Sequence, residues 1–242
     1  NLEATKLNAL SATQIRGLTN TQIAALDTTA LAALDATRFG NLTSTQVKAF
    51  TTTQVGNFEA QDLVKFGTSQ LSSLTTAQVG ALTSSGIADL DATQIRAFAT
   101  TQLNVLSSTN LNALSSTQMA ALTTTQVVGL STTQAALFSA TNIQSLTTTQ
   151  VGVLTTGQLG RLTSEALIAF DATQFGALSA TQVRSLTTTQ LGTLEASDIA
   201  EFTTTQIAGL ATTQIRGLNE TAIAALAATQ IAAMTVAQVQ SL

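Results

Sequence analysis

Residues 147–154 read TTTQVGVL, and residues 187–194 read TTTQLGTL. The same eight-residue unit, which we call an octad, fills residues 3–242 thirty times without an insertion or a deletion. With positions labelled p1 to p8, p8 is Leu in 22 octads, Phe in seven and Met in one, and its column reaches back to Leu2. Position p5 is apolar in all thirty. A short, fixed repeat of this kind is typical of solenoid proteins.

The octad fits neither one long helix nor one continuous strand. Eight residues advance an α-helix by about 80° beyond two full turns, so no face of a long helix would keep the apolar pair buried. The apolar spacing of five and then three is odd both times, which places p5 and p8 on opposite faces of a strand. Because Thr, Val and Ile favour strands, a β-solenoid stays open as the alternative.

The local pattern predicts a short helix that begins anew in each octad. In LTTTQV (residues 146–151), Thr147 and Gln150 form the capping-box pair, while Leu146 and Val151 have the spacing of a hydrophobic staple. Sixteen octads combine Ser, Thr or Asp at p1 with Gln at p4. Glycine is common at p6 or p7, as at Gly152, where we expect it to ease the exit into the next cap.

Helices of this length are unstable alone, so we expect p5 and p8 to stack into a shared core. The predicted fold is an all-α solenoid of about 30 very short capped helices, one per octad. Ten octads lack Gln at p4, and they recur about every 27 residues, which predicts about 3.4 octads in each coil, or turn, of the solenoid. These octads begin at Glu3, Asp27, Asp35, Glu59, Thr83, Ser107, Ser139, Thr163, Glu195 and Asn219.

Acidic residues follow the same schedule, since 11 of the 13 lie in the octads that lack Gln at p4. We therefore predict one charged stripe along the solenoid, with neutral Thr, Gln, Ser and Ala over the rest of the surface. The candidate stripe residues are Glu3, Asp27, Asp35, Glu59, Asp62, Asp89, Glu165, Glu195, Asp198, Glu201 and Glu220.

Composition argues against several classes of function. The net charge of −4 and the pI near 4.6 do not fit a nucleic-acid partner, and no apolar run approaches the ~20 residues that span a bilayer. With no His, Cys or Tyr, we expect no enzyme and no cofactor, and we read Asp198 and Glu201 as a solvated pair. Weak sharing of calcium between stripe carboxylates stays open. So does ice binding by the Thr columns.

The whole chain, residues 1–242, is predicted to be one octapeptide-repeat solenoid, as an excerpt of a longer array or a filament subunit. Low charge over most of the girth would let rods associate without repulsion. We therefore expect self-association, either end-to-end or lateral.

The octads LTTTQV, LSATQV and LTTTQI resemble those of very large, repetitive bacterial cell-surface proteins that are often labelled adhesins. The resemblance covers the entire chain and transfers no functional residue. It implies an extracellular or cell-surface setting in which the repeats act as a stalk. The predicted function is that of a structural rod, a spacer or a filament. The alternative is a binding module for ice, glycan or a partner protein, which would use a Thr-rich face or the charged stripe.

Overall fold

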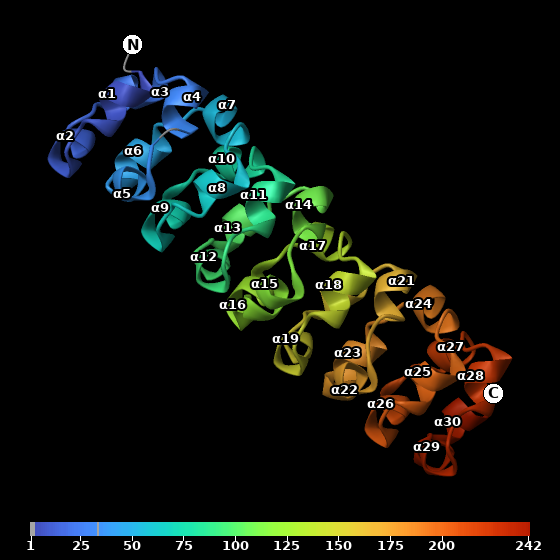
Figure 1. Ribbon diagram of the computed structural model, residues 1–242. Coiled ribbons are helices and arrows are strands. Elements are labelled where there is room, and N and C mark those ends of the chain that lie inside the picture. Colours follow the sequence, from blue (N-terminus) through green and yellow to red (C-terminus); the bar gives the residue numbers. More distant parts are fainter. Residues whose placement is uncertain (1–2, 33) are drawn as a thin grey trace. The chain divides into compact units, whose positions relative to one another are not determined.

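The structure is a computed structural model that describes residues 3–32 and 34–242 (Figure 1). Within these residues the chain forms thirty helices of four to six residues, one in each octad, and no strand. The prediction of an all-α fold with one short helix per octad is therefore confirmed, and the β-solenoid alternative is not supported. Leu2, the first member of the p8 column, lies outside the described residues.

The described chain divides into two compact units, Asn1–Leu122 (unit 1) and Thr123–Leu242 (unit 2). Unit 1 contains α1 (Ala4–Asn8), α2 (Ala12–Arg16), α3 (Asn20–Ala24), α4 (Thr28–Ala32), α5 (Ala36–Gly40), α6 (Ser44–Lys48), α7 (Thr52–Gly56), α8 (Ala60–Leu63), α9 (Thr68–Ser73), α10 (Thr76–Gly80), α11 (Ser84–Ala88), α12 (Ala92–Arg96), α13 (Thr100–Leu103), α14 (Ser108–Asn112) and α15 (Ser116–Ala121). Unit 2 contains α16 (Thr124–Gly129), α17 (Thr132–Ala135), α18 (Ala140–Gln144), α19 (Thr148–Gly152), α20 (Thr156–Leu159), α21 (Ser164–Leu167), α22 (Ala172–Ala177), α23 (Ala180–Arg184), α24 (Thr188–Gly192), α25 (Ala196–Ala200), α26 (Thr204–Gly209), α27 (Thr212–Ile215), α28 (Glu220–Ala224), α29 (Ala228–Ala233) and α30 (Val236–Val239).

Most helices begin at a p1 residue whose side chain caps them, as the sequence predicts. Among the described residues, the p1 residues that precede a helix without a side-chain cap bond are Glu3, Gly67, Ala99, Glu195, Ala211 and Ala227. In α19 the N-cap Thr147 is extended, with φ −70° and ψ 157°. Its backbone N–H donates to Gln150 Oε1 over 2.7 Å, and the Gln150 N–H donates back to Thr147 Oγ1 over 3.2 Å. Fifteen of the sixteen predicted capping boxes show both bonds. In these fifteen octads the capping box sets where the helix begins.

The helix ends do not depend on glycine. None of the described glycines has a positive φ, so none uses the left-handed conformation that favours glycine at a helix end. In α19 the residue after the helix, Val153, has φ −98° and ψ −3°. The expected role of glycine in the exit is therefore wrong, because this right-handed step connects the helix to the next extended cap without a left-handed residue.

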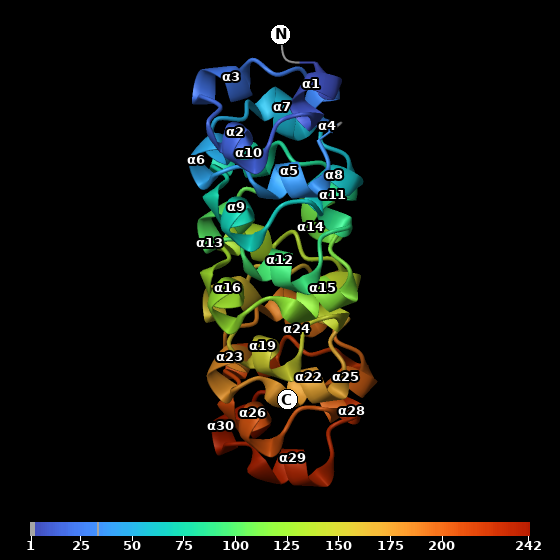
Figure 2. The ribbon, with the colours of Figure 1, turned by 60° about the vertical axis from the view of Figure 1, so that its left-hand side comes forward.

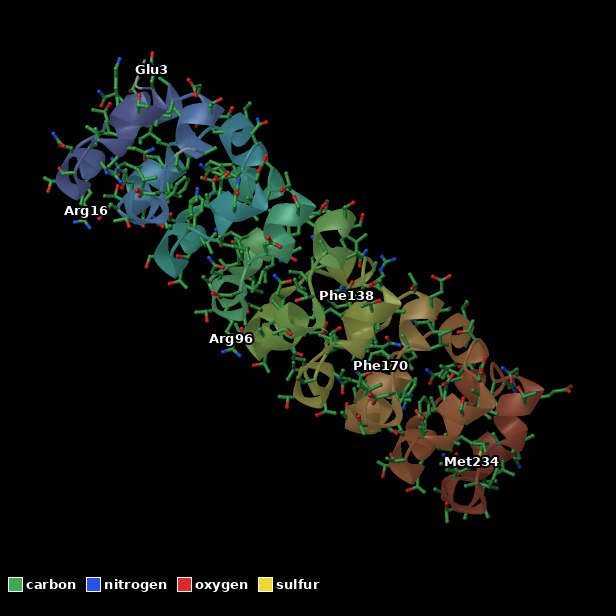
Figure 3. All side chains as sticks on the ribbon, in the orientation of Figure 1. Glu3, Arg16, Arg96, Phe138, Phe170 and Met234 are labelled. Atoms are coloured by element: carbon green, nitrogen blue, oxygen red, sulfur yellow. The ribbon has the colours of Figure 1, made fainter. Side chains whose placement is uncertain are left out.

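The apolar columns form the core of both units. From Ile23 to Leu218 every p5 and p8 side chain is buried. Phenylalanines cluster in unit 1, where the rings of Phe39 and Phe66 lie 4.8 Å apart between centroids. Phe170, in unit 2, points into the interior, whereas Arg96 lies on the outer surface of unit 1 (Figure 3). The predicted core is thus present in each unit.

Within each unit, helices pack in a repeated manner against the helix three octads away. In unit 1, α8 contacts α11, and α11 contacts α14; in unit 2, α23 contacts α26, and α26 contacts α29. Figure 2 shows α1, α4, α8, α11 and α14 following one another along one edge of unit 1, with α3, α6 and α9 along the opposite edge. Each unit is a solenoid-like all-helical repeat.

Candidate functional site

The p4 glutamines make hydrogen bonds in two directions at once. The side chain of Gln158 is 1% exposed, and its Oε1 accepts from the Thr155 N–H over 2.8 Å to close the capping box. Its Nε2 donates to the carbonyl oxygens of Val127, over 2.7 Å, and Leu130, over 2.8 Å. These carbonyls belong to p5 and p8 of the octad four places earlier. One glutamine therefore caps its own helix and binds it to another part of the solenoid.

This arrangement recurs within both units, and we call it the glutamine ladder. In every member Nε2 donates to the p8 carbonyl 28 residues earlier, over 2.6–2.9 Å. The members are Gln46, Gln54, Gln70, Gln78, Gln94, Gln102 and Gln118 in unit 1, and Gln158, Gln174, Gln182, Gln190, Gln206, Gln214, Gln230 and Gln238 in unit 2. The ladder gives buried main-chain carbonyls a partner that the four-to-six-residue helices do not supply.

The ladder corrects the expectation that glutamine covers the surface. Eighteen of the twenty p4 glutamines are buried, and only Gln14 and Gln22 are exposed. The sequence held one indication of this second role. A capping box accepts Glu as well as Gln at p4, yet none of the thirty octads has Glu there. A carboxylate could close the box but could not donate to the carbonyls.

In some octads where p4 is not Gln, another side chain takes over the ladder bond. In the octad 219–226, p4 is Ala222, and the p1 residue Asn219 does both tasks. Asn219 Oδ1 accepts from the Ala222 N–H over 2.8 Å, and its Nδ2 donates to the Leu194 carbonyl over 3.0 Å. Leu194 is the p8 residue four octads earlier, which is the usual acceptor.

At Gly86 the space for a p4 side chain is already filled. A Cβ added there would lie 2.3 Å from Cδ1 of Leu63, the p5 side chain three octads earlier. The close approach of α11 to α8 therefore accounts for glycine at this position.

In octad 59–66 the two tasks are divided between an acid and a base. Asp62, at p4, is fully buried, and its Oδ2 accepts from the Glu59 N–H over 3.1 Å. The Lys65 ammonium, at p7, lies 2.9 Å from Asp62 Oδ1 and donates to the Leu34 carbonyl over 3.0 Å. It also lies 5.7 Å from the ring centroid of Phe39. Asp62 thus supplies the acceptor of a ladder glutamine, and Lys65 supplies the donor.

Octad 195–202 has the same p4 acid but a second acid at p7. Asp198 Oδ2 accepts from the Glu195 N–H over 2.8 Å, as Asp62 does from Glu59. Oε2 of Glu201 is buried and makes no hydrogen bond within the described residues. Burial raises the pKa of the Glu201 carboxyl, and the negative charges of Asp198 and Asp171 raise it further.

The structure places the predicted stripe residues in three environments. Eight are exposed: Glu3, Asp27, Asp35, Glu59, Asp89, Glu165, Glu195 and Glu220. Asp198 and Glu201 are half-buried, and Asp62 is buried. Two of them are N-caps that accept from a main-chain N–H, Asp27 from Ala30 and Asp35 from Arg38. Reading Asp62 as a solvated charge is wrong, because the cap and Lys65 together compensate its burial. Nor is Glu201 fully solvated.

Arg38, in a stripe octad, and Arg16, in octad 11–18, also have partners. Arg38 pairs with Asp35, and the N–H of Arg38 lowers the pKa of the Asp35 carboxyl. An open groove of about 660 Å³ in unit 1 has Arg16 and Lys65 in its wall. Both are already engaged, since Arg16 donates to Asn41 Oδ1 over 3.2 Å and Lys65 binds Asp62.

The described residues contain no group of three or more acidic, His or Cys side chains arranged to hold a metal ion. The weak sharing of calcium stays a prediction. Among the same residues, no helix combines the length and apolar character needed to cross a membrane.

Comparison with known families identifies a repeat. Residues 55–92, 87–124 and 151–188 match the model of the ALTTAQ repeat family. The six letters correspond to p7, p8 and p1 to p4 of the octads, as in SLTTAQ at residues 73–78. These positions contain the first residue of the staple (p8), the cap (p1) and the ladder glutamine (p4). The matched segments thus support a repeat region, and no curated protein matches the chain.

Proposed function

We propose that this chain is a structural, non-catalytic repeat segment that acts as a stiff rod, a spacer or a filament at the cell surface or outside the cell. The observation that carries the proposal is the glutamine ladder, which joins octads four places apart along both units. A protein whose repeated contacts join successive turns is suited to the role of a stiff spacer.

The same contacts support a coil of about 27 residues. Helices pack against helices three octads, or 24 residues, away, whereas the ladder reaches four octads, or 32 residues, back. A turn of about 3.4 octads lies between these two spacings and would bring both neighbours into contact. In this arrangement each coil presents ladder donors on one side and main-chain acceptors on the other. A second copy of the same coil could meet either side, which favours end-to-end association.

The alternative function is a binding module, and one observation favours it. The p1 to p3 positions project threonines into solvent in many octads, as at Thr51, Thr52 and Thr53, which are all exposed. Such columns could contact ice or a glycan. A saturable ligand for the isolated chain, or inhibition of ice recrystallisation, would favour this alternative over a purely structural role.

The rod proposal can be tested by doubling the number of octads in the chain. A tandem of two copies of residues 3–242 keeps the octad register, and its maximum dimension by small-angle X-ray scattering should double with an unchanged cross-section. Sedimentation at several concentrations measures self-association separately. A tandem that behaves as two independent compact bodies, or as one larger globule, would contradict the rod.

A further inference from the structure

Two parts of the chain repeat each other at a distance of 136 residues. Octads 59–66 and 195–202 read EAQDLVKF and EASDIAEF, and the octads three places before them read DATRFGNL (35–42) and DATQFGAL (171–178). The aromatic contacts also correspond, since Phe39 and Phe66 lie 4.8 Å apart and Phe175 and Phe202 lie 5.2 Å apart. Residue 201 is therefore the counterpart of Lys65.

The correspondence shows which hydrogen-bond donor is missing from octad 195–202: the counterpart of the Lys65 ammonium. Lys65 donates to the Leu34 carbonyl, 31 residues earlier. The carbonyl at the same distance before Glu201 is that of Phe170, the usual p8 acceptor of the ladder for this octad. An ionised carboxylate has no proton to donate, whereas a protonated carboxyl has one O–H. The buried Oε2 of Glu201 is a polar atom whose partner is still to be accounted for.

The charged groups around this position are all acidic. Asp198, on the same octad, and Asp171, the N-cap of α22, act on the Glu201 carboxyl. Helix α28 packs against α25 and brings Glu220, and the octad that contains Phe170 brings Glu165. The neighbouring α24, α26 and α29 octads contain no charged residue. At the corresponding place in unit 1, Arg38 and Lys65 balance Asp35 and Asp62.

We propose that Glu201 is a proton-dependent member of the ladder: in its protonated form it donates its O–H to the Phe170 main-chain carbonyl, and in its ionised form this contact between octads 195–202 and 163–170 opens. The raised pKa of Glu201 agrees in direction. A group whose pKa is higher in the folded than in the unfolded chain stabilises the fold fully at low pH, and this contribution is lost as the pH rises through the folded value. Unit 2 should therefore tighten locally as the pH falls through the folded pKa of Glu201 and loosen as the pH rises above it.

The experiment compares the full 242-residue chain with Glu201→Gln and Glu201→Lys across the pH range 4.5–7.5. Both replacements carry an N–H donor whose presence does not depend on pH, so the Tm at pH 7.5 should rise by about 2–4 °C, which corresponds to about 1 kcal/mol for a chain of this size. The pH dependence of the Tm should fall in both variants. The controls are Glu3→Gln and Glu3→Lys, which make the same charge changes at an exposed acid of unit 1.

The titration of the Glu201 carboxyl carbon by NMR in the unmodified chain gives a second readout that needs no variant. We expect its midpoint to lie above the ordinary glutamate value of 4.5, and amide exchange in residues 195–202 to quicken as Glu201 ionises. A Glu201 midpoint at or below 4.5 would overturn the proposal. So would equal changes in pH dependence for the Glu201 and Glu3 variants.

Discussion

Octads 59–66 and 195–202 are two versions of one design. Both place an Asp at p4 that accepts from the N–H of a p1 Glu, and both lack the ladder glutamine. In the first, Lys65 donates to the carbonyl four octads earlier and neutralises the buried Asp62. In the second, Glu201 stands in the place of the lysine. The difference shows that the ladder requires an acceptor for the cap and a donor for the earlier octad, which need not belong to one residue.

The largest expected effect comes from giving unit 1 the arrangement of unit 2. Lys65→Glu leaves Asp62 buried without its cation and removes the donor to Leu34, and breaking a buried pair costs about 3–5 kcal/mol of unfolding free energy. Chemical denaturation at pH 7 measures the loss. The variant should recover part of its stability as the pH falls and the introduced carboxyl protonates.

Lys48→Glu is the matched control, because Lys48 is exposed and the charge change is the same. Its cost should stay within about 0.5 kcal/mol, as for an ordinary surface substitution. Equal losses in the two variants would show that net charge, and not the ladder, separates the two octads.

An intermediate effect is expected where an ordinary ladder octad receives an acid. Gln158→Glu keeps the acceptor for the Thr155 N–H but replaces the donor to Val127 and Leu130 with an oxygen. Buried carbonyls then lose their partner and face a second acceptor, at a cost of about 2–4 kcal/mol. Thermal and urea unfolding measure this change.

The control is the same substitution at Gln22, which has the same capping box but is exposed. Gln22→Glu should be nearly neutral. If both substitutions lower the free energy of unfolding equally, the p4 glutamine stabilises the fold through the capping box and not through the bond between octads.

The sequence predicted the parts of the fold that depend on neighbours in the chain. The caps, such as Thr147 with Gln150, and the buried p5 and p8 columns follow from spacings of three to five residues, which a single sequence displays directly. The second bond of the glutamines was missed because its acceptors are main-chain carbonyls 28–31 residues away, and every residue type has such a carbonyl. The absence of Glu from p4 was the one sequence feature that indicated this second bond.

The candidate stripe was predicted less well than the core, for a related reason. Charge periodicity indicates which octads are exceptional but not which atoms of them face water. Asp62 and Glu59 lie in the same octad, and only Glu59 is exposed. The burial of Asp62 depends on Lys65 bonding to a carbonyl 31 residues earlier, a pairing that the stripe hypothesis did not contain.

The smallest expected effect concerns Asp171, whose charge acts on Glu201 in octad 195–202. The hydroxyl of Thr173 and the N–H of Gln174 lower the pKa of Asp171 below its ordinary value of 3.8. The stability that it contributes is therefore present above this value and is lost as the pH falls through the lower, folded value. Asp171→Asn should flatten the loss of Tm below pH 4.

Since the charge of Asp171 also raises the pKa of Glu201, the same variant should shift the Glu201 midpoint downward. NMR titration of Glu201 in Asp171→Asn measures this shift. An unchanged midpoint would mean that the two groups do not interact across the octads.

The central claim is that glutamine side chains join octads four places apart, and the exchange of their amide protons tests it most directly. In a ¹⁵N NMR spectrum of the 242-residue chain, the Nε2 protons of ladder residues such as Gln78 and Gln158, which donate to buried carbonyls, should exchange with solvent far more slowly than those of the exposed Gln14 and Gln22. Uniformly fast exchange of all p4 glutamine side chains, at the rate of Gln14 and Gln22, would contradict the account.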